Sequence, residues 1–359
     1  MSGSDVHDRG AAARADDAVV RVAHGLAAAE ATTWSGLFLR ALPLPYWTRR
    51  KRREIEDLHD RDGLLSWPVP FALNQDPDPL RAAPGPRSEW YAFQAGLVAD
   101  AGGRYDRAAA LRAWRALADG PEPPRLTLGQ RAALDHLLAG TPPPVSGHDH
   151  PHPFDDAATV RAVALAAALH ADPAALAAAV AEDAPISNAD DGVACALAVA
   201  AVTAALLAGA DVSDAVAEAR TRLPNGTWAA IHVDRALRHA DTADDPLDLA
   251  MRLDHDLANA AYSYADAAPD VVAIALAILR STYPRVEAGL LAAAAVPRHA
   301  AGVAPLVGAL FAAGGQLPAP LPRLLARTPP LLGLALPRLR GVRLADLASG
   351  APRLPSEGE

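Results

Sequence analysis

The chain has 359 residues, enough for a large core, and 51% of them are hydrophobic although only 5% are aromatic. A formal net charge of −9 speaks against a protein dedicated to nucleic acid or to an anionic membrane surface. One cysteine, Cys195, excludes a disulfide framework and fits a reducing compartment. Most of the apolar residues are Ala and Leu, which favour helices, so the composition predicts an all-α protein.

The sequence predicts neither a signal peptide nor a membrane-spanning helix. The N-terminus, MSGSDVHDRGAAARADD, lacks the apolar region of a signal peptide, and residues 1–15 and 348–359 are predicted to be disordered. The apolar run 192–209 is nearly long enough to cross a bilayer, but its Ala and Val content indicates a buried central helix. A cytoplasmic protein is therefore expected.

Helices are predicted along nearly the whole chain. The first begins at Asp17, and a proline-rich insert at about 40–85 contains one charged segment, TRRKRREIEDLHDRD, interpreted as a solvated helix. TLGQ at 127–130 resembles a capping box, and Asp172-Pro173 resembles an N-cap followed by Pro at the first helical position. Further helices are expected at 88–101, 105–118, 128–139, 156–170, 190–208, 213–222, 228–240, 246–260, 270–281, 284–296 and 302–314, with short ones up to about 347. We interpret residues 16–347 as one all-α domain.

The loop GHDHPHPFDD is the most visible cluster of potential metal ligands. Its histidines, His148, His150 and His152, follow no standard spacing, and the prolines prevent one helix from presenting them together, so a solvated loop is favoured. Asp155 and Asp156 begin an apolar helix, where carboxylates can cap exposed N–H groups. The sequence leaves open whether this loop binds a metal.

Five stretches occur in the order found in the ADP-ribosylglycohydrolase family, which includes the dinitrogenase reductase-activating glycohydrolases. They are GLAAAEATTW (25–34), GPRSEWYAFQAGLVADAG (85–102), DDAATVRAVALAAAL (155–169), ISNADDGVACALAVAAVTAALLAG (186–209) and VPRHAAGVAPLVGALFAAGG (296–315). The chain resembles this family over roughly residues 18–347. The resemblance implies a single large orthogonal helical bundle that hydrolyses N- or O-glycosidic bonds of ADP-ribosylated substrates.

The resemblance also implies two Mg²⁺ ions, held by the carboxylates of a T-D-D-T and a D-x-D-T motif. Here the first motif falls on Gly85-Pro86-Arg87-Ser88, and the Asp positions of the second fall on His299 and Ala301. Mg²⁺ prefers hard oxygen ligands, and a cation in its place repels it. We therefore expect no metal or other cofactor, although Mg²⁺ is expected for the family.

Three hypotheses follow. In the first, the protein is a metal-free pseudo-hydrolase, or acts without metal, and binds an ADP-ribose-like or nucleotide-like ligand. In the second it is an active hydrolase that uses other ligands, and in the third a helical scaffold for a protein partner. The candidate ligand-binding residues are Arg87, Ser88, Glu89, Asp155, Asp156, Arg298 and His299, and the candidate acids or bases are Glu30 and Glu89.

Overall fold

The computed structural model describes residues 17–31, 84–257, 267–296, 298–317 and 330–349. Of the two ends predicted to be disordered, 1–15 and 348–359, all but residues 348 and 349 lie outside these ranges, and those two belong to the 3₁₀ turn Leu344–Ser349. Nearly all of the proline-rich insert with its charged segment also lies outside them. Within the described part of the chain there is no strand, and one isolated bridge joins Asp155 to Ala267. The predicted all-α fold is confirmed.

The helices follow one another with short connections. A first helix covers 17–31. It is followed by α3 (Pro86–Asp100), α4 (Arg107–Arg115), α5 (Leu128–Leu138), α6 (Val145–His148), α7 (Ala157–Leu169), α8 (Pro173–Asp183), α9 (Asp191–Leu207), α10 (Val212–Thr221), α11 (Trp228–Ala240), α12 (Pro246–Leu257), α13 (Ala268–Thr282), α14 (Val286–Ala295) and α15 (Ala300–Ala313), with short 3₁₀ turns between and after them.

Local signals fix where several of these helices begin. The Thr127 hydroxyl accepts from the Gln130 N–H at 3.2 Å, and the Gln130 side chain accepts from the Thr127 N–H at 3.0 Å, so the predicted capping box at α5 is present. The Asp172 carboxylate caps α8 by accepting the N–H groups of Ala174 and Ala175, and Pro173 occupies the first helical position. These caps explain why the sequence locates both helices.

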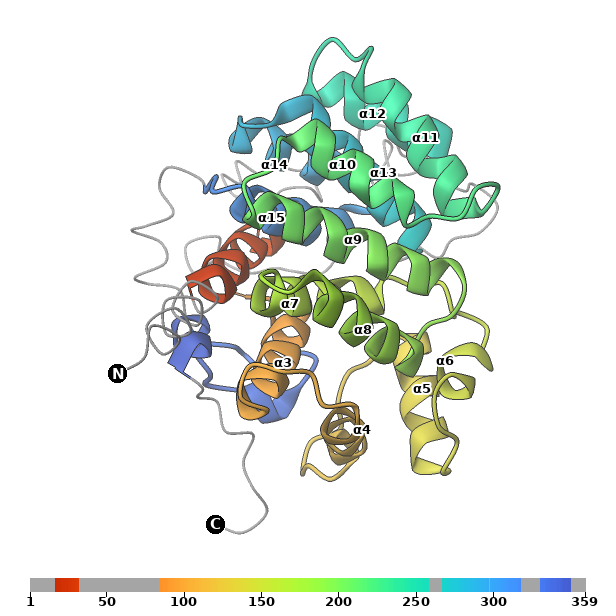
Figure 1. The fold of residues 1–359 in the computed structure, drawn as a ribbon, viewed down its shortest axis with the longest axis vertical. Coiled ribbons are helices and arrows are strands. Elements are labelled where there is room, and N and C mark those ends of the chain that lie inside the picture. Colours follow the sequence, from red (N-terminus) through yellow and green to blue (C-terminus); the bar gives the residue numbers. More distant parts are fainter. Residues whose placement is uncertain (1–16, 32–83, 258–266, 297, 318–329, 350–359) are drawn as a thin grey trace, which may run out of the picture.

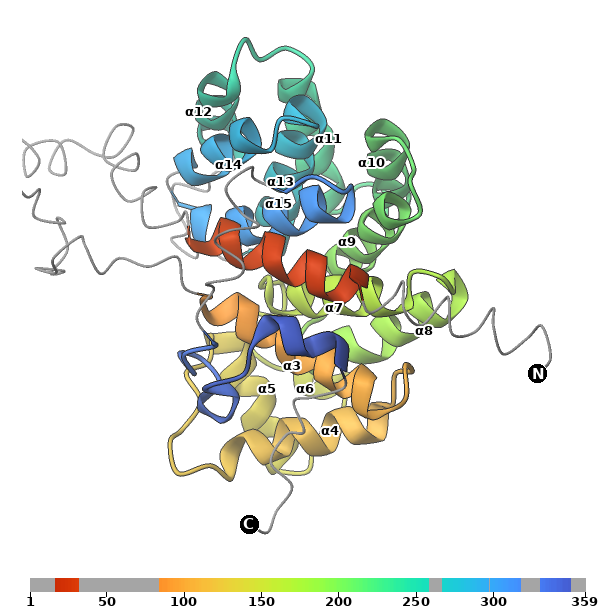
Figure 2. The same cartoon turned by 90° about the vertical axis from the view of Figure 1, so that its left-hand side faces the viewer.

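The N-terminal helix lies between α15 and α3 in both views (Figures 1 and 2). Arg21 donates to the Ala312 carbonyl of α15 at 3.0 Å, and the Tyr91 hydroxyl of α3 donates to the Val19 carbonyl at 2.8 Å. The C-terminal segment 330–349 lies beside α3 (Figure 2). Both ends of the described chain therefore pack beside α3.

Helix α9, which contains the apolar run noted in the sequence, packs against α7, α10, α13 and α15. It joins the upper and lower halves of the molecule in Figure 1. Cys195 in this helix is fully buried, and burial raises the pKa of its thiol well above the ordinary value. No helix in the described ranges has the length and apolar character needed to span a bilayer.

The crossing of the N-terminal helix with α15 depends on two glycines. A Cβ added to Gly308 would overlap the Gly25 carbonyl oxygen and the Ala29 side chain, and one added to Gly25 would overlap Gly308 and Ala312. The two backbones can approach this closely only because neither residue has a side chain.

We expect Gly308→Ala to lower the free energy of unfolding by about 1–3 kcal/mol, since the helices must separate to admit the methyl group. Urea denaturation measures the effect. Gly96→Ala in α3 is the matched control, because a Cβ there meets nothing within 4 Å. That variant should be neutral or up to about 1 kcal/mol more stable, because Ala favours the helix. Equal destabilisation by both substitutions would contradict the close crossing.

Candidate functional site

Glu30 ends the N-terminal helix and caps the start of α3. Its carboxylate accepts backbone N–H groups from Gly85 at 2.9 Å, Arg87 at 2.8 Å and Ser88 at 3.1 Å, together with the Ser88 hydroxyl at 2.7 Å. The first N–H groups of a helix have no partner within the helix, and the dipole favours an anion there. Glu30 thus serves as an N-cap from a distant part of the chain.

The opening "GP" of this stretch has a steric reason. A Cβ on Gly85 would lie 2.5 Å from the Glu30 carboxyl carbon, so only glycine admits the carboxylate at that point. Pro86 occupies the first helical position, where its missing N–H has no cost. The carboxylate that caps this helix start comes from the N-terminal helix.

Arg87 extends from the same turn to the start of α7. Its Nη2 and Nε donate to the same Asp156 oxygen, Oδ2, at 2.7 and 3.2 Å, and the exposed fractions of the two side chains are 17% and 4%. A Cβ on Gly302 would lie 2.7 Å from that Asp156 oxygen, so the start of α15 is also adjacent. The N-terminal ends of α3, α7 and α15 therefore converge on one carboxylate and one guanidinium.

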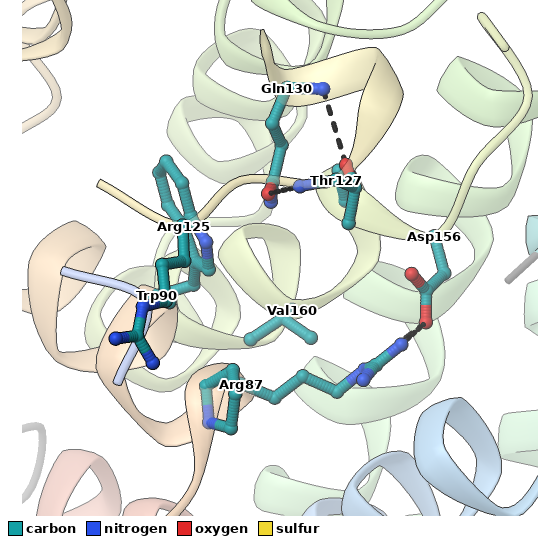
Figure 3. A pocket seen from close by; sticks show the side chains of 10 residues that line it. Arg87, Trp90, Arg125, Thr127, Gln130, Asp156 and Val160 are labelled. Carbon is teal, nitrogen blue, oxygen red and sulfur yellow. Dashed lines mark hydrogen bonds and ion pairs between the residues drawn. The ribbon is translucent and has the colours of Figure 1, made fainter. Parts of the chain in front are cut away.

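A small pocket opens beside this ion pair (Figure 3). Its volume is about 60 Å³, and its lining residues are Pro86, Arg87, Trp90, Arg125, Thr127, Gln130, Asp156, Ala157, Val160 and Ala335. This volume holds a few water molecules and is well below the ~300–1,000 Å³ of sites that enclose a whole drug-sized ligand. The pocket fits one small group of a ligand, with the remainder outside.

The pocket rests on an aromatic stack. The rings of Trp90 and Trp114 lie 5.0 Å apart, and the Arg161 guanidinium lies 5.1 Å from the Trp114 ring on α4. Trp90, Trp114 and Arg161 are each at most 4% exposed. Buried, mutually packed rings hold this side of the pocket rigid.

Glu89 does not line the pocket but lies directly behind it. Its carboxylate is fully buried and accepts the N–H groups of Leu334, Ala335 and Leu336 at 2.6, 2.7 and 2.7 Å. Burial raises the pKa of Glu89, and the three N–H donors counteract this only in part. The carboxylate binds the C-terminal segment to α3.

Asp155 is also fully enclosed by partners. It accepts from the Thr127 hydroxyl at 3.0 Å, from Asn188 Nδ2 at 3.0 Å and from the Ala157 N–H at 3.0 Å. Burial raises its pKa above the ordinary value. Through these contacts Asp155 joins the starts of α5 and α7 to the loop before α9.

His299 precedes α15 and contacts a different carboxylate from Arg87. The His299 Nε2 lies 3.4 Å from the Asp270 carboxylate of α13, and both Arg298 and His299 lower the pKa of Asp254, against the larger effect of its burial, which raises it. Burial acts to raise the pKa of Asp270, but the neighbouring His232 and His299 lower it overall. His299 thus contacts Asp270, whereas Gly302, three residues later, adjoins the Asp156 carboxylate that pairs with Arg87.

The histidine-rich loop runs from the end of α6 to the start of α7. His148 ends α6, and the Nε2 of His150 lies 3.2 Å from the Ser187 carbonyl. Across the described ranges, no group of three or more His, Cys, Asp or Glu side chains is arranged to hold a metal ion. At the start of α3, Pro86, Arg87 and Ser88 supply a guanidinium and a hydroxyl where the family resemblance implies carboxylates, and this donor set does not suit the two Mg²⁺ ions.

Comparisons with known proteins identify the family and the fold. A sequence profile described as ADP-ribosylglycohydrolase matches residues 46–349. The chain belongs to the ADP-ribosylglycohydrolase family. A solved structure titled "ADP-ribosylglycohydrolase-related protein complex" superposes with a TM-score of 0.55, at 16% identity, over 94% of this chain and 97% of that chain, which shows a shared fold. A comparison with curated protein sequences gives no match.

Of the ten residues that line the pocket, sequence analysis named two, Arg87 and Asp156, as candidate site residues. Arg125, Gln130 and Ala335 line it, and none was a candidate. The Thr127–Gln130 capping box was recognised only as a helix start. Ala335 gave no sequence signal, because its place depends on contacts between α3 and a segment more than 200 residues away.

Proposed function

We propose that this member of the family binds an ADP-ribose-like or nucleotide-like ligand without a metal, through an anionic group of the ligand. The observation that carries the proposal is the Arg87 guanidinium beside the buried Asp156, at the position where the family places its metal ligands. A guanidinium supplies positive charge and directed N–H donors, which suit a phosphate or carboxylate.

Arg125 supports the proposal with a second cation. Its side chain is exposed at the rim of the pocket, opposite Val160, with Trp90 behind it (Figure 3). Two arginines against the single Asp156 carboxylate give the lining a net positive charge, which attracts an anion. A phosphate at the pocket and a ribose or base outside it would match the volume.

The two candidate catalytic carboxylates favour binding over hydrolysis. Glu30 accepts four hydrogen bonds at the start of α3, and Glu89 accepts three from the C-terminal segment. A general acid or base must reach the substrate proton, whereas both of these groups are committed to backbone N–H donors. We therefore propose a pseudo-hydrolase rather than an enzyme with substituted catalytic groups.

Titration calorimetry with ADP-ribose tests this function, first in EDTA and then in excess Mg²⁺. We expect the same affinity in both buffers. Binding that requires Mg²⁺ would contradict the proposal and favour an active hydrolase with other ligands. Absence of binding in both buffers would also contradict it and leave the scaffold hypothesis.

Arg125→Ala is expected to weaken ADP-ribose binding about tenfold, the effect of losing one charge-assisted contact. Because Arg125 is exposed, the fold should persist, and circular dichroism checks this. Arg235→Ala, which removes an equally exposed cation from α11, is the matched control and should leave the affinity unchanged. A similar loss in both variants would indicate a nonspecific charge effect.

A further inference from the structure

The C-terminal segment supplies a wall of the pocket. Ala335 is 3% exposed and lines the pocket together with Arg87 and Trp90. In the sequence it follows Glu89 by 246 residues, and its N–H donates to the Glu89 carboxylate. Its carbonyl accepts the Arg125 N–H at 2.8 Å. Ala335 is therefore held between α3 on one side and the loop before α5 on the other.

Two carboxylates attach this segment, and they differ in burial. Glu89 accepts three consecutive N–H groups, 334 to 336, while fully buried. Glu122 pairs with both terminal nitrogens of Arg340, at 2.9 and 2.8 Å, on the surface. Buried charge-assisted bonds stabilise a conformation far more than exposed ion pairs, which water and salt screen. Glu89 is the attachment that matters for the shape of the pocket.

We propose that residues 330–349 form a closing strap over the ligand pocket, with Glu89 as the positioning residue that holds the strap and Ala335 as the residue that limits the size of the group admitted. The part that concerns a ligand rests on the proposed function; the closure of the pocket by the strap does not. Glu89 acts through the backbone of 334–336 and touches no ligand.

The apolar contacts of the strap fit this role. Leu331, Leu336, Leu339, Leu344 and Leu347 are each at most 3% exposed, so both ends of the strap are anchored in the core. Ala335 lies between the anchors Leu331 and Leu336 and lines the pocket, and backbone hydrogen bonds to Glu89 and Arg125 hold it there. Loosening of Glu89 would open the pocket without detaching the strap.

A labelling experiment without ligand tests the closure. Ala157 lines the pocket on the α7 side and is 5% exposed, so a cysteine placed there reports access, and the native Cys195 is buried and silent. In the Ala157→Cys background, we expect Glu89→Gln to raise the rate of iodoacetamide labelling at least tenfold. Glu122→Gln, which breaks only the exposed pair, is the matched control and should leave the rate unchanged. Equal rates in the two variants would overturn the proposal.

A second variant acts in the opposite direction and leaves the strap attached. Ala335→Leu enlarges the wall residue, so it should slow labelling of the Ala157→Cys thiol and weaken ADP-ribose binding at least tenfold in calorimetry. An unchanged labelling rate would show that Ala335 does not limit the pocket and would overturn the proposal, even if Glu89→Gln fails to fold. If the wild-type protein does not bind ADP-ribose, the proposed function fails, whereas the labelling rates still decide the strap.

Discussion

Replacement of Arg161 by methionine is expected to lower the free energy of unfolding by about 3–5 kcal/mol, the typical cost of breaking a buried ion pair from one side. Arg161 is fully buried in α7, and its Nε donates to Asp183 at 2.8 Å. Its other nitrogens donate to the Ser187 hydroxyl at 3.0 Å and the Ala157 carbonyl at 3.0 Å. Methionine fills much of the space but leaves the Asp183 carboxylate without its cation.

Urea denaturation of the variant and of the double variant Arg161→Met, Asp183→Leu separates charge from packing. We expect the double variant to recover part of the loss, because no unpaired charge then remains in the interior. Arg222→Met is the matched surface control: Arg222 pairs with Glu218 one turn earlier on α10, both about half exposed. Its effect should be within about 0.5 kcal/mol. A loss below about 1 kcal/mol for Arg161→Met would contradict the structural role of the ion pair.

Most helices could be predicted from the sequence because the residues that cap their first turns are close neighbours in the chain. Thr127 with Gln130, and Asp172 with Pro173, satisfy N–H groups within one turn, so neighbouring residues are sufficient to predict them. The one-turn helix α6, within the predicted loop, was missed, since four residues give no periodic pattern. An all-α bundle follows from the composition together with these local signals.

The site was harder to predict because its side chains pair with residues that are far away in the sequence. Arg87 was a candidate, but its partner Asp156 is on another helix, and nothing in either stretch specifies the pairing. Glu30 and Glu89 were considered as acids or bases, and the structure shows both accepting backbone N–H groups of distant segments. A carboxylate on a buried helix face has the same sequence pattern in either role, so only tertiary contacts distinguish them.

This distinction gives Glu30 a measurable structural effect. We expect Glu30→Gln to lower the free energy of unfolding by about 2–4 kcal/mol, since an amide has one acceptor oxygen and an NH₂ group that faces N–H donors. Glu30 is 7% exposed, so water cannot easily take over the lost hydrogen bonds. The first turn of α3, and with it Arg87, should then lose its fixed position.

Ser88→Ala is the matched control, because it removes only the hydroxyl bond to Glu30 and leaves the three backbone N–H donors paired. Its cost should be about 1 kcal/mol, measured by the same urea denaturation. Hydrogen exchange should also be faster at the amides of 87 and 88 in Glu30→Gln, while Ser88→Ala leaves them protected. Equal stability losses in the two variants would show that the carboxylate is not the principal cap. A larger loss in Glu30→Gln, together with faster exchange at 87 and 88, would show that the Glu30 carboxylate holds Arg87 in place, which is the geometry that the proposed metal-free binding requires.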